Sequence, residues 1–175
     1  MSPFPRLFIL ALLISIFYTP TPSWAAEEKA PQKILIFDFD LIDYADTLNA
    51  GPDAAHKKRM ALTAEVLRQE IRNSTRFEIV DIDLASDMLE EMGLPPNCNG
   101  CELKIARELD ADLVGIGVVS RTSGLILDIS FYILDAVTGE TMWVKVVGIR
   151  GDDDNSWTRG VKYMARNYLL KGYQK

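Results

Sequence analysis

The chain has 175 residues, 48% of them hydrophobic and 25% charged, and a formal net charge of −6 at pH 7. These proportions are ordinary for a globular protein, and the length is sufficient for one domain with a sizeable core. The negative charge repels phosphate backbones and anionic lipids, so we expect no nucleic acid and no membrane surface as a partner. Basic proteins and cations remain compatible with it.

The first 25 residues have the pattern of a cleaved export signal. A basic residue, Arg6, precedes an apolar run over residues 7–18, and Ser23-Trp24-Ala25 offers the small residues that a signal peptidase requires. The run is shorter than the ~20 residues needed to cross a bilayer, and no cysteine follows it directly to carry a lipid anchor. We therefore expect cleavage near Ala25 and a periplasmic or secreted protein, with residues 26–32 as a flexible leader.

The remaining residues, 33–175, predict a single α/β domain. Runs rich in β-branched and aromatic residues first alternate with amphipathic helices and then follow one another directly. The order β-α-β-α-α-β-β-β-α predicts one layered domain in which a mixed sheet of about five strands is flanked by helices. We expect strands over 33–40, 77–81, 112–120, 124–136 and 140–150, and helices over 53–73, 84–92, 98–109 and from residue 154 or 155 onwards.

Local patterns predict which residues form the core. Residues 41–52 are expected to be a loop, and Asp53 to cap the helix that follows. Gly115 and Gly117 share one face of their strand, which predicts the close approach of a helix to that face. The expected core stripes comprise His56, Met60, Ala64, Leu67 and Ile71 in the long helix, Leu125, Leu127, Ile129, Phe131 and Ile133 in the longest strand, and Trp157, Val161, Met164 and Tyr168 in the last helix.

The only two cysteines, Cys98 and Cys101, form a C-x-x-C pair. In an exported protein such a pair is expected to be oxidised, and we expect a small structural disulfide. The same spacing occurs in thiol–disulfide proteins, where a helix N-terminus lowers the pKa of the first cysteine, but the acidic Glu102 beside this pair opposes that effect. A zinc site needs four ligands, and only two lie nearby. We favour a structural disulfide over a redox role, and a redox role over metal binding, and all three interpretations stay open.

Aspartates gather in two loops of the predicted fold. Carboxylates in loops are the ligands that hard cations such as Ca²⁺ prefer, so Asp152, Asp153 and Asp154 are candidate metal ligands. The alternative is that the aspartates solvate strand ends and cap the last helix, with Asp154 or Asn155 as its N-cap. The complete set comprises Asp38, Asp40, Asp43 and Asp46 after the first strand and Asp152, Asp153 and Asp154 before the last helix.

No assembled catalytic set is recognisable in the chain. His56 is the only histidine and lies at the start of an amphipathic stripe, as expected for a partly buried helical residue. The chain has no G-x-S-x-G sequence, and Gly115-Ile116-Gly117 lacks the third glycine and the following helix of a dinucleotide-binding loop. We therefore expect no cofactor and no enzymatic activity.

Several segments carry a family resemblance, namely Cys98–Cys101, Glu108–Asp112, Leu125–Asp128, Asp135–Gly139 and Arg150–Gly160. They resemble a family of small exported bacterial proteins with no assigned function. The C-x-x-C pair and the Arg-Gly…Ser-Trp…Arg-Gly sequence are the more specific features. More distantly, residues 111–140 and the helix after them are similar to the amino-terminal domain of TolB and to the curli-secretion lipoprotein family. These resemblances imply a mixed sheet with flanking helices that serves protein–protein contact.

Together these observations predict an exported, non-enzymatic accessory or assembly protein that binds another exported protein. A thiol–disulfide protein and a module that binds a cation or small ligand are the alternatives. An uncovered edge strand would also allow pairing with a second copy of the chain. The expected partner surface comprises Asp38, Asp40, Asp43, Asp46, Arg150, Asp152, Asp153, Asp154, Trp157 and Arg159.

Overall fold

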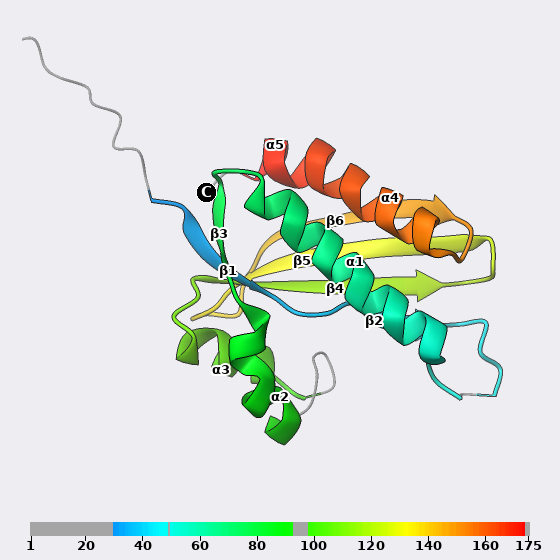
Figure 1. Ribbon diagram of the computed structural model, residues 1–175, viewed down its shortest axis with the longest axis horizontal. Helices are drawn as coiled ribbons and strands as arrows, with labels where there is room; N and C mark the ends of the chain where they lie inside the picture. The colour runs from blue at the N-terminus through cyan, green and yellow to red at the C-terminus, as the bar shows by residue number, and fades with distance from the viewer. Residues whose placement is uncertain (1–29, 49, 93–97, 174–175) are drawn as a thin grey trace, which may run out of the picture.

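Six strands form one mixed sheet in the computed structural model, which describes residues 30–48, 50–92 and 98–173 (Figure 1). The expected export signal and most of the leader lie outside the described residues. The strand order is β3-β1-β4-β5-β6, with β1 parallel to its two neighbours and β4-β5-β6 antiparallel. The strands are β1 Gln32–Ile36, β2 Asp40–Asp43, β3 Phe77–Val80, β4 Leu113–Arg121, β5 Ile126–Asp135 and β6 Thr141–Arg150.

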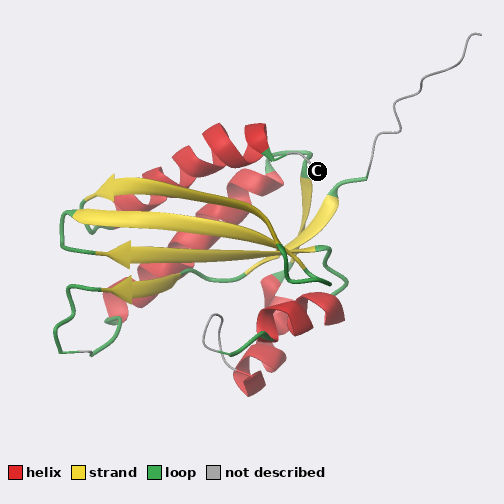
Figure 2. Cartoon of the chain, turned by 180° about the vertical axis from the view of Figure 1, so that it is seen from behind, coloured by secondary structure: helices red, strands yellow, loops and turns green. Residues whose placement is uncertain are grey.

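Helices cover the two faces of this sheet unequally. The first and fourth α-helices pack on one face, and the second and third cover the other face only near β1, β3 and the start of β4 (Figure 1). Seen from behind, the rest of that second face has no helix over it (Figure 2). No described helix is both long and apolar enough to span a membrane. The helices are α1 Ala54–Arg72, the 3₁₀ turn η1 Ile82–Ala85, α2 Ser86–Met92, α3 Cys101–Glu108, α4 Asp154–Met164, the π-helical turn η2 Ala165–Leu169 and α5 Leu170–Gly172.

This arrangement confirms the predicted α/β class and mixed sheet, with one correction at the first strand. The expected strand over 33–40 and the expected loop over 41–52 are wrong in detail, because the chain forms two short strands separated by a break. β2 follows β1 along the same edge of β4, and both strands pair with β4 in parallel. The sheet therefore has six strands in place of five.

A one-residue insertion in the β1–β2 segment explains the break. The chain advances four residues from Ile36 to Asp40, while β4 advances three from Gly115 to Val118. Because side chains alternate along a strand, the extra residue reverses the alternation. Phe39 consequently lies in the same buried cluster as Ile36, although residues three positions apart on a regular strand point to opposite faces.

Arg68 of α1 satisfies the backbone at this break. Its guanidinium is buried and donates from Nε and Nη2 to the carbonyl oxygen of Ile36, at 3.1 and 2.7 Å. Nη2 also donates to Asp38 Oδ1 at 2.9 Å. A buried carbonyl without a partner is costly, so the arginine allows the ladder to be interrupted inside the sheet. Asp38 thus lies at the insertion, and Asp40 begins β2 after it.

The two glycines of β4 make room for aromatic side chains, which corrects the expected approach of a helix. A Cβ on Gly117 would overlap the ring of Phe39, and a Cβ on Gly115 would lie 2.7 Å from the ring of Phe131. The rings of Phe39 and Phe131 stack with centroids 6.2 Å apart. The glycines therefore serve packing within the sheet's covered face.

The core stripes agree with the sequence with few exceptions. Asp53 caps α1 by accepting from the amide of His56 at 2.8 Å, as predicted. The N-cap of α4 is Asp153, one residue before the expected position. Tyr168 is partly exposed and Leu169 is buried, because the π-helical turn shifts the stripe by one residue. Buried as expected are His56, Ala64, Leu67, Ile71, Leu127, Ile129, Phe131, Ile133, Trp157, Val161 and Met164, whereas Leu125 is exposed and lies outside β5.

Substituting Gly117 with alanine tests the packing at the insertion. We expect Gly117→Ala to lower the free energy of unfolding by about 1–3 kcal/mol, because the buried, stacked Phe39 ring has little room to move away from the added methyl group. Denaturant-induced unfolding measures the change. Gly124→Ala is the matched control, since its Cβ would meet nothing within 4 Å, and we expect a change within about 0.5 kcal/mol. Equal effects of the two variants would contradict this packing.

Candidate functional site

The two aspartate groups predicted from the sequence meet at one end of the sheet. Arg121, the last residue of β4, donates from Nε and Nη2 to the two carboxylate oxygens of Asp43 at 2.9 and 2.6 Å. Its Nη1 also lies 3.4 Å from Asp152 Oδ2, in the loop after β6. The arginine therefore joins the end of β2 to the loop after β6. In the sequence, these two segments share only their high content of aspartate.

Asp152 lies at the centre of this end of the molecule, with only 13% of its side chain exposed. Arg59 Nη1 donates to its Oδ1 at 2.5 Å, and the indole Nε1 of Trp157 donates to the same oxygen at 3.2 Å. His56 Nε2 lies 2.9 Å from Oδ2. One carboxylate thus contacts α1, β4 and α4. We call this set the Asp152 cluster, comprising Asp43, His56, Arg59, Arg121, Asp152 and Trp157.

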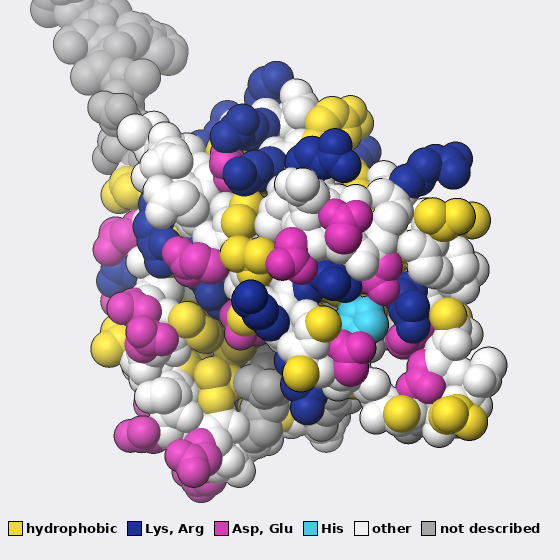
Figure 3. All heavy atoms as spheres, turned by 45° about the vertical axis from the view of Figure 1, so that its right-hand side comes forward, with side chains coloured by type: hydrophobic (Ala, Val, Ile, Leu, Met, Phe, Trp, Pro, Cys, Tyr) yellow, Lys and Arg dark blue, Asp and Glu magenta, His cyan; other side chains and the backbone are white. Residues whose placement is uncertain are grey.

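Packing of the aromatic ring reinforces the cluster. Trp157 is fully buried, and the guanidinium carbon of Arg59 lies 5.3 Å from the centroid of its ring. A cation over an indole face is attractive, more so where water is excluded. The burial of Trp157 agrees with its expected place in the core stripe of the last helix and overturns the expectation that it also faces a partner. In the space-filling view, the single histidine side chain is visible among acidic and basic neighbours (Figure 3).

The other predicted aspartates have local roles. Asp153 caps α4 by accepting from the amide and hydroxyl of Ser156, both at 2.9 Å. Asp154 Oδ1 accepts from Arg59 Nε at 3.0 Å, and Asp46 accepts from backbone amides of its own loop. Asp40 begins β2 and takes part in none of these contacts.

Hydrogen bonds to the carboxylates shift their pKa values. Donation from the Arg121 guanidinium lowers the pKa of Asp43 below its ordinary value, and the bond raises the pKa of Arg121. The pKa of Asp153 is lowered chiefly by the backbone amide of Ser156 and then by its hydroxyl. Both carboxylates are therefore charged at neutral pH, as a helix N-cap and an ion pair require.

This geometry is that of an internal polar network. Both ring nitrogens of His56 lie beside carboxylates, with Nδ1 at 3.1 Å from Asp53, and in the described part of the chain no serine or cysteine is hydrogen-bonded to the ring. Asp152, Asp153 and Asp154 were candidate cation ligands, but their oxygens accept from nitrogen and hydroxyl donors. The cluster holds elements together and presents no assembled nucleophile and base.

The predicted disulfide between Cys98 and Cys101 is present, with the two Cα atoms 5.4 Å apart. Cys101 begins α3 and is buried in the small core cluster beneath α2 and α3, which includes Ile105 and Val114. Glu102 Oε2 lies 3.6 Å from the sulfur of Cys98. These three side chains are close enough for a metal site, but sulfurs bonded to each other are not thiolate ligands. The bond attaches the start of α3 to the preceding segment.

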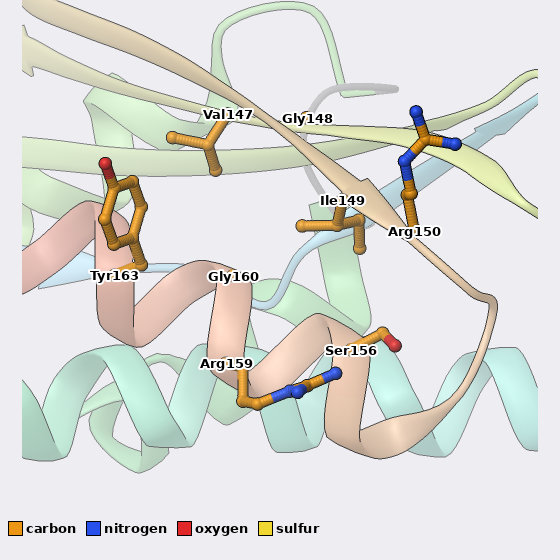
Figure 4. A pocket seen from close by; sticks show the side chains of 8 residues that line it. All are labelled: Val147, Gly148, Ile149, Arg150, Ser156, Arg159, Gly160 and Tyr163. Carbon is orange, nitrogen blue, oxygen red and sulfur yellow. The ribbon is translucent and has the colours of Figure 1, made fainter.

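A groove of about 300 Å³ lies between β6 and α4 (Figure 4). Val147 and Ile149 point from the strand toward the helix, and Tyr163 extends from the helix beside the strand. Ile149 packs directly against Gly160 of the helix, where an added Cβ would lie 2.5 Å from Ile149 Cγ2. The lining residues are Val147, Gly148, Ile149, Arg150, Ser156, Arg159, Gly160 and Tyr163. Arg150 and Arg159, both predicted for a partner surface, are exposed here.

Sequence reasoning missed the basic half of the cluster. Arg59 lies one helical turn after His56, and this spacing was the available signal that both side chains share a face of α1. Arg121 ends a strand far along the chain and carries no comparable signal. The contact between Asp43 and Asp152 through Arg121 depends on sheet topology, which pairs β2 with the end of β4.

Removing the charge of Asp152 tests its central position. We expect Asp152→Asn to lower the free energy of unfolding by about 3 kcal/mol, because Arg59 and Arg121 would remain mostly buried without their shared counter-ion. Asp154→Asn is the matched control. Its side chain is 56% exposed, so we expect a loss below about 1 kcal/mol. Urea unfolding of both variants measures the difference, and equal losses would contradict the central position of Asp152.

The chain is similar in fold to several solved structures. The C-terminal domain of LpoB from Salmonella enterica is 20% identical with a TM-score of 0.50, covering 71% of this chain and 87% of that one. Lipoprotein GNA1162 from Neisseria meningitidis is 17% identical with a TM-score of 0.48, and the match covers 72% of this chain and 85% of that one. TolB from Acinetobacter baumannii is 13% identical with a TM-score of 0.41, and the match covers 80% of this chain and 29% of that one. Likeness at this level shows the fold alone.

No curated protein matches the chain. One family model, described as a protein of unknown function (DUF2380), matches residues 32–169. This match covers the sheet, the Asp152 cluster and the disulfide, and it agrees with the resemblance to a family without an assigned function. The chain therefore belongs to this family of proteins of unknown function.

Proposed function

We propose that the protein is an exported, non-enzymatic accessory or assembly factor that binds another exported protein. The observation that carries the proposal is the face of the sheet left without a helix (Figure 2). α1 and α4 cover one face fully, whereas α2 and α3 cover the second face only in part. A sheet face that keeps apolar side chains in contact with water is typical of a protein-binding surface.

The register identifies the residues of this open face. Ser130 pairs with Val118 on one side and Val146 on the other, and Tyr132 pairs with Val144. Because side chains alternate, these residues point away from the core face that contains Phe131. Val144 and Val146 are 49% and 50% exposed, and Ile42 of β2 is 41% exposed. We define the open face as Ile42, Val118, Ser130, Tyr132, Val144 and Val146.

The rest of the molecule supports a binding role. The export pattern at the N-terminus favours a periplasmic or secreted location. The charged end of the sheet forms contacts within the protein, as the Asp152 cluster shows, and of the partner surface expected from the sequence Arg150 and Arg159 stay in the proposal because both are exposed. No observation of similar weight favours the thiol–disulfide or cation-binding alternatives, since Cys101 is buried and the loop aspartates accept hydrogen bonds from protein donors.

A capture experiment with matched variants tests the proposal. The mature chain is immobilised and offered the soluble envelope fraction of the organism that carries it. Any retained protein is identified, purified and titrated against the wild type and against Val144→Thr/Val146→Thr. Threonine keeps the shape and β-propensity of valine but would bury a hydroxyl group without a partner. We expect affinity for the partner to fall by about tenfold or more.

The control variant is Leu84→Thr/Val137→Thr, which alters two apolar residues that are 65% and 75% exposed and lie outside the open face. We expect the control to bind as the wild type does. Failure to retain any protein reproducibly would contradict the proposed function, as would turnover of a substrate by the pure chain. A partner that binds all three forms equally would contradict the assignment of the open face.

A further inference from the structure

We propose that the free edge of β6, together with the groove between β6 and α4, binds an extended acidic segment of the partner protein by strand addition. The inference rests on the proposed function and specifies where and how the partner is held. It is carried by three independent features of the same region, which are an unpaired strand edge, a groove beside it and a local excess of basic side chains.

β6 presents the long free edge of the sheet. It has ten residues and lies at the end of the strand order, and among the described residues it pairs with β5 only. The opposite edge consists of the short strands β3 and β2, each of four residues. An edge strand carries outward amide and carbonyl groups that can bond to a further strand. The length of β6 is sufficient for a continuous ladder with an extended peptide.

The groove lies where alternate side chains of an added strand would extend. Its two walls are β6 and α4 (Figure 4). A Cβ on Gly160 would lie 2.5 Å from Ile149 Cγ2, so the helix approaches the strand closely at this glycine. In an added strand, successive side chains point to opposite faces of the sheet. One set would reach the groove, and the other set would lie beside the open face.

Charge specifies the chemistry of the partner segment. The chain as a whole carries −6, yet residues 141–150 and 155–175 contain no Asp or Glu. The three aspartates between these segments, Asp152, Asp153 and Asp154, accept hydrogen bonds from Arg59 and Ser156 within the protein. The basic residues of these two segments are Lys145, Arg150, Arg159, Lys162, Arg166, Lys171 and Lys175. Space filling shows Lys and Arg side chains over the upper part of the face drawn, where the C-terminal helices lie (Figure 3). An acidic segment is therefore the complementary partner.

The two arginines of the groove are available for such a segment. Elsewhere in the fold, guanidinium groups form ion pairs with carboxylates, as in Arg59, Arg68, Arg72, Arg121 and Arg166. Among the described residues, neither Arg150 nor Arg159 forms an ion pair, and the contact that Arg159 makes is with the backbone oxygen of Asn155 at 3.3 Å. Arginine recognises carboxylates through paired hydrogen bonds. The same basic charge disfavours pairing of β6 with β6 of a second copy.

Peptide binding to the full mature chain tests the inference. The probe is a fluorescein-labelled ten-residue peptide that alternates glutamate and valine, and binding is followed by fluorescence anisotropy. Two control peptides separate the contribution of acidic charge from that of backbone hydrogen bonds. One has lysine in place of glutamate, and the other has proline in place of valine. The proline peptide keeps the acidic charge but lacks the amides that an added strand needs. We expect the glutamate–valine peptide to bind and both controls to bind at least about tenfold more weakly.

Variants locate the binding surface. We expect Arg150→Ser/Arg159→Ser to weaken binding of the glutamate–valine peptide by about tenfold or more, while Lys57→Ser/Lys58→Ser leaves it within about twofold. The control removes the same charge from exposed positions on α1. Equal binding of the proline peptide would overturn strand addition, and unchanged binding by the arginine variant would overturn the groove. A chain that forms dimers through β6 and excludes the peptide would overturn the inference in favour of a second copy.

The same peptide separates this inference from the proposed function. A captured partner that the glutamate–valine peptide fails to displace, and that binds Arg150→Ser/Arg159→Ser normally, would leave the proposed function standing and refute the groove as its site. Absence of any captured partner would refute the proposed function itself, whatever the peptide does. Displacement of the partner by the peptide supports both.

Discussion

One carboxylate, that of Asp152, connects elements of this protein that lie far apart in the sequence. It accepts hydrogen bonds from Arg59 of α1 and Trp157 of α4 and lies within ion-pair distance of Arg121 at the end of β4. Without this carboxylate, the guanidinium groups of Arg59 and Arg121 would lie near each other and near the buried indole of Trp157 without their shared counter-ion. An ion pair of this kind stabilises the fold only while every partner is present, because each charge left alone in a dry environment is costly.

The position of Asp152 also determines the shape of the groove. The residue lies in the short connection between β6 and α4, so its contacts orient the start of the helix relative to the edge strand. Asp153 then caps the helix, and Gly160 allows it to approach Ile149 closely. The groove beside the edge of β6 follows from this packing (Figure 4). The ion-paired charges thus lie inside the network, whereas Arg150 and Arg159 beside β6 are exposed.

Much of the fold could be predicted from the sequence, because its periodicities are strong. The alternation in β5, the stripe of α1 and the capping aspartate before α1 all correspond to the structure. The sequence does not predict β2. Phe37, Asp38 and Phe39 continue the alternation of apolar and polar residues of β1, so the sequence shows no sign of the residue inserted there relative to β4. Only the pairing partner on β4 reveals such an insertion. The role of Arg68, which bonds the interrupted backbone, was hidden for the same reason.

The candidate site was predictable only in part. Composition identifies the aspartates, and chain order places them in loops. Their counter-ions, Arg59 of α1 and Arg121 of β4, come from two elements that no sequence pattern connects. Exposed and buried charges also look alike in a sequence, so the sequence predicts a partner surface that includes Asp152, although the structure leaves only 13% of its side chain exposed. The open face and the β6 edge depend on which strand ends the sheet, and strand order is a property of the assembled fold.

Amide hydrogen exchange along β6 in the isolated mature chain tests the central claim most directly, namely that this edge is free to receive another strand. In an edge strand of an antiparallel pair, every second amide points away from its neighbour and has no partner. The account predicts alternating fast and slow exchange from Met142 to Arg150, with uniformly slow exchange in the central strand β5. Uniformly slow exchange along β6 in the chain alone would contradict the account, because the edge would then be covered already.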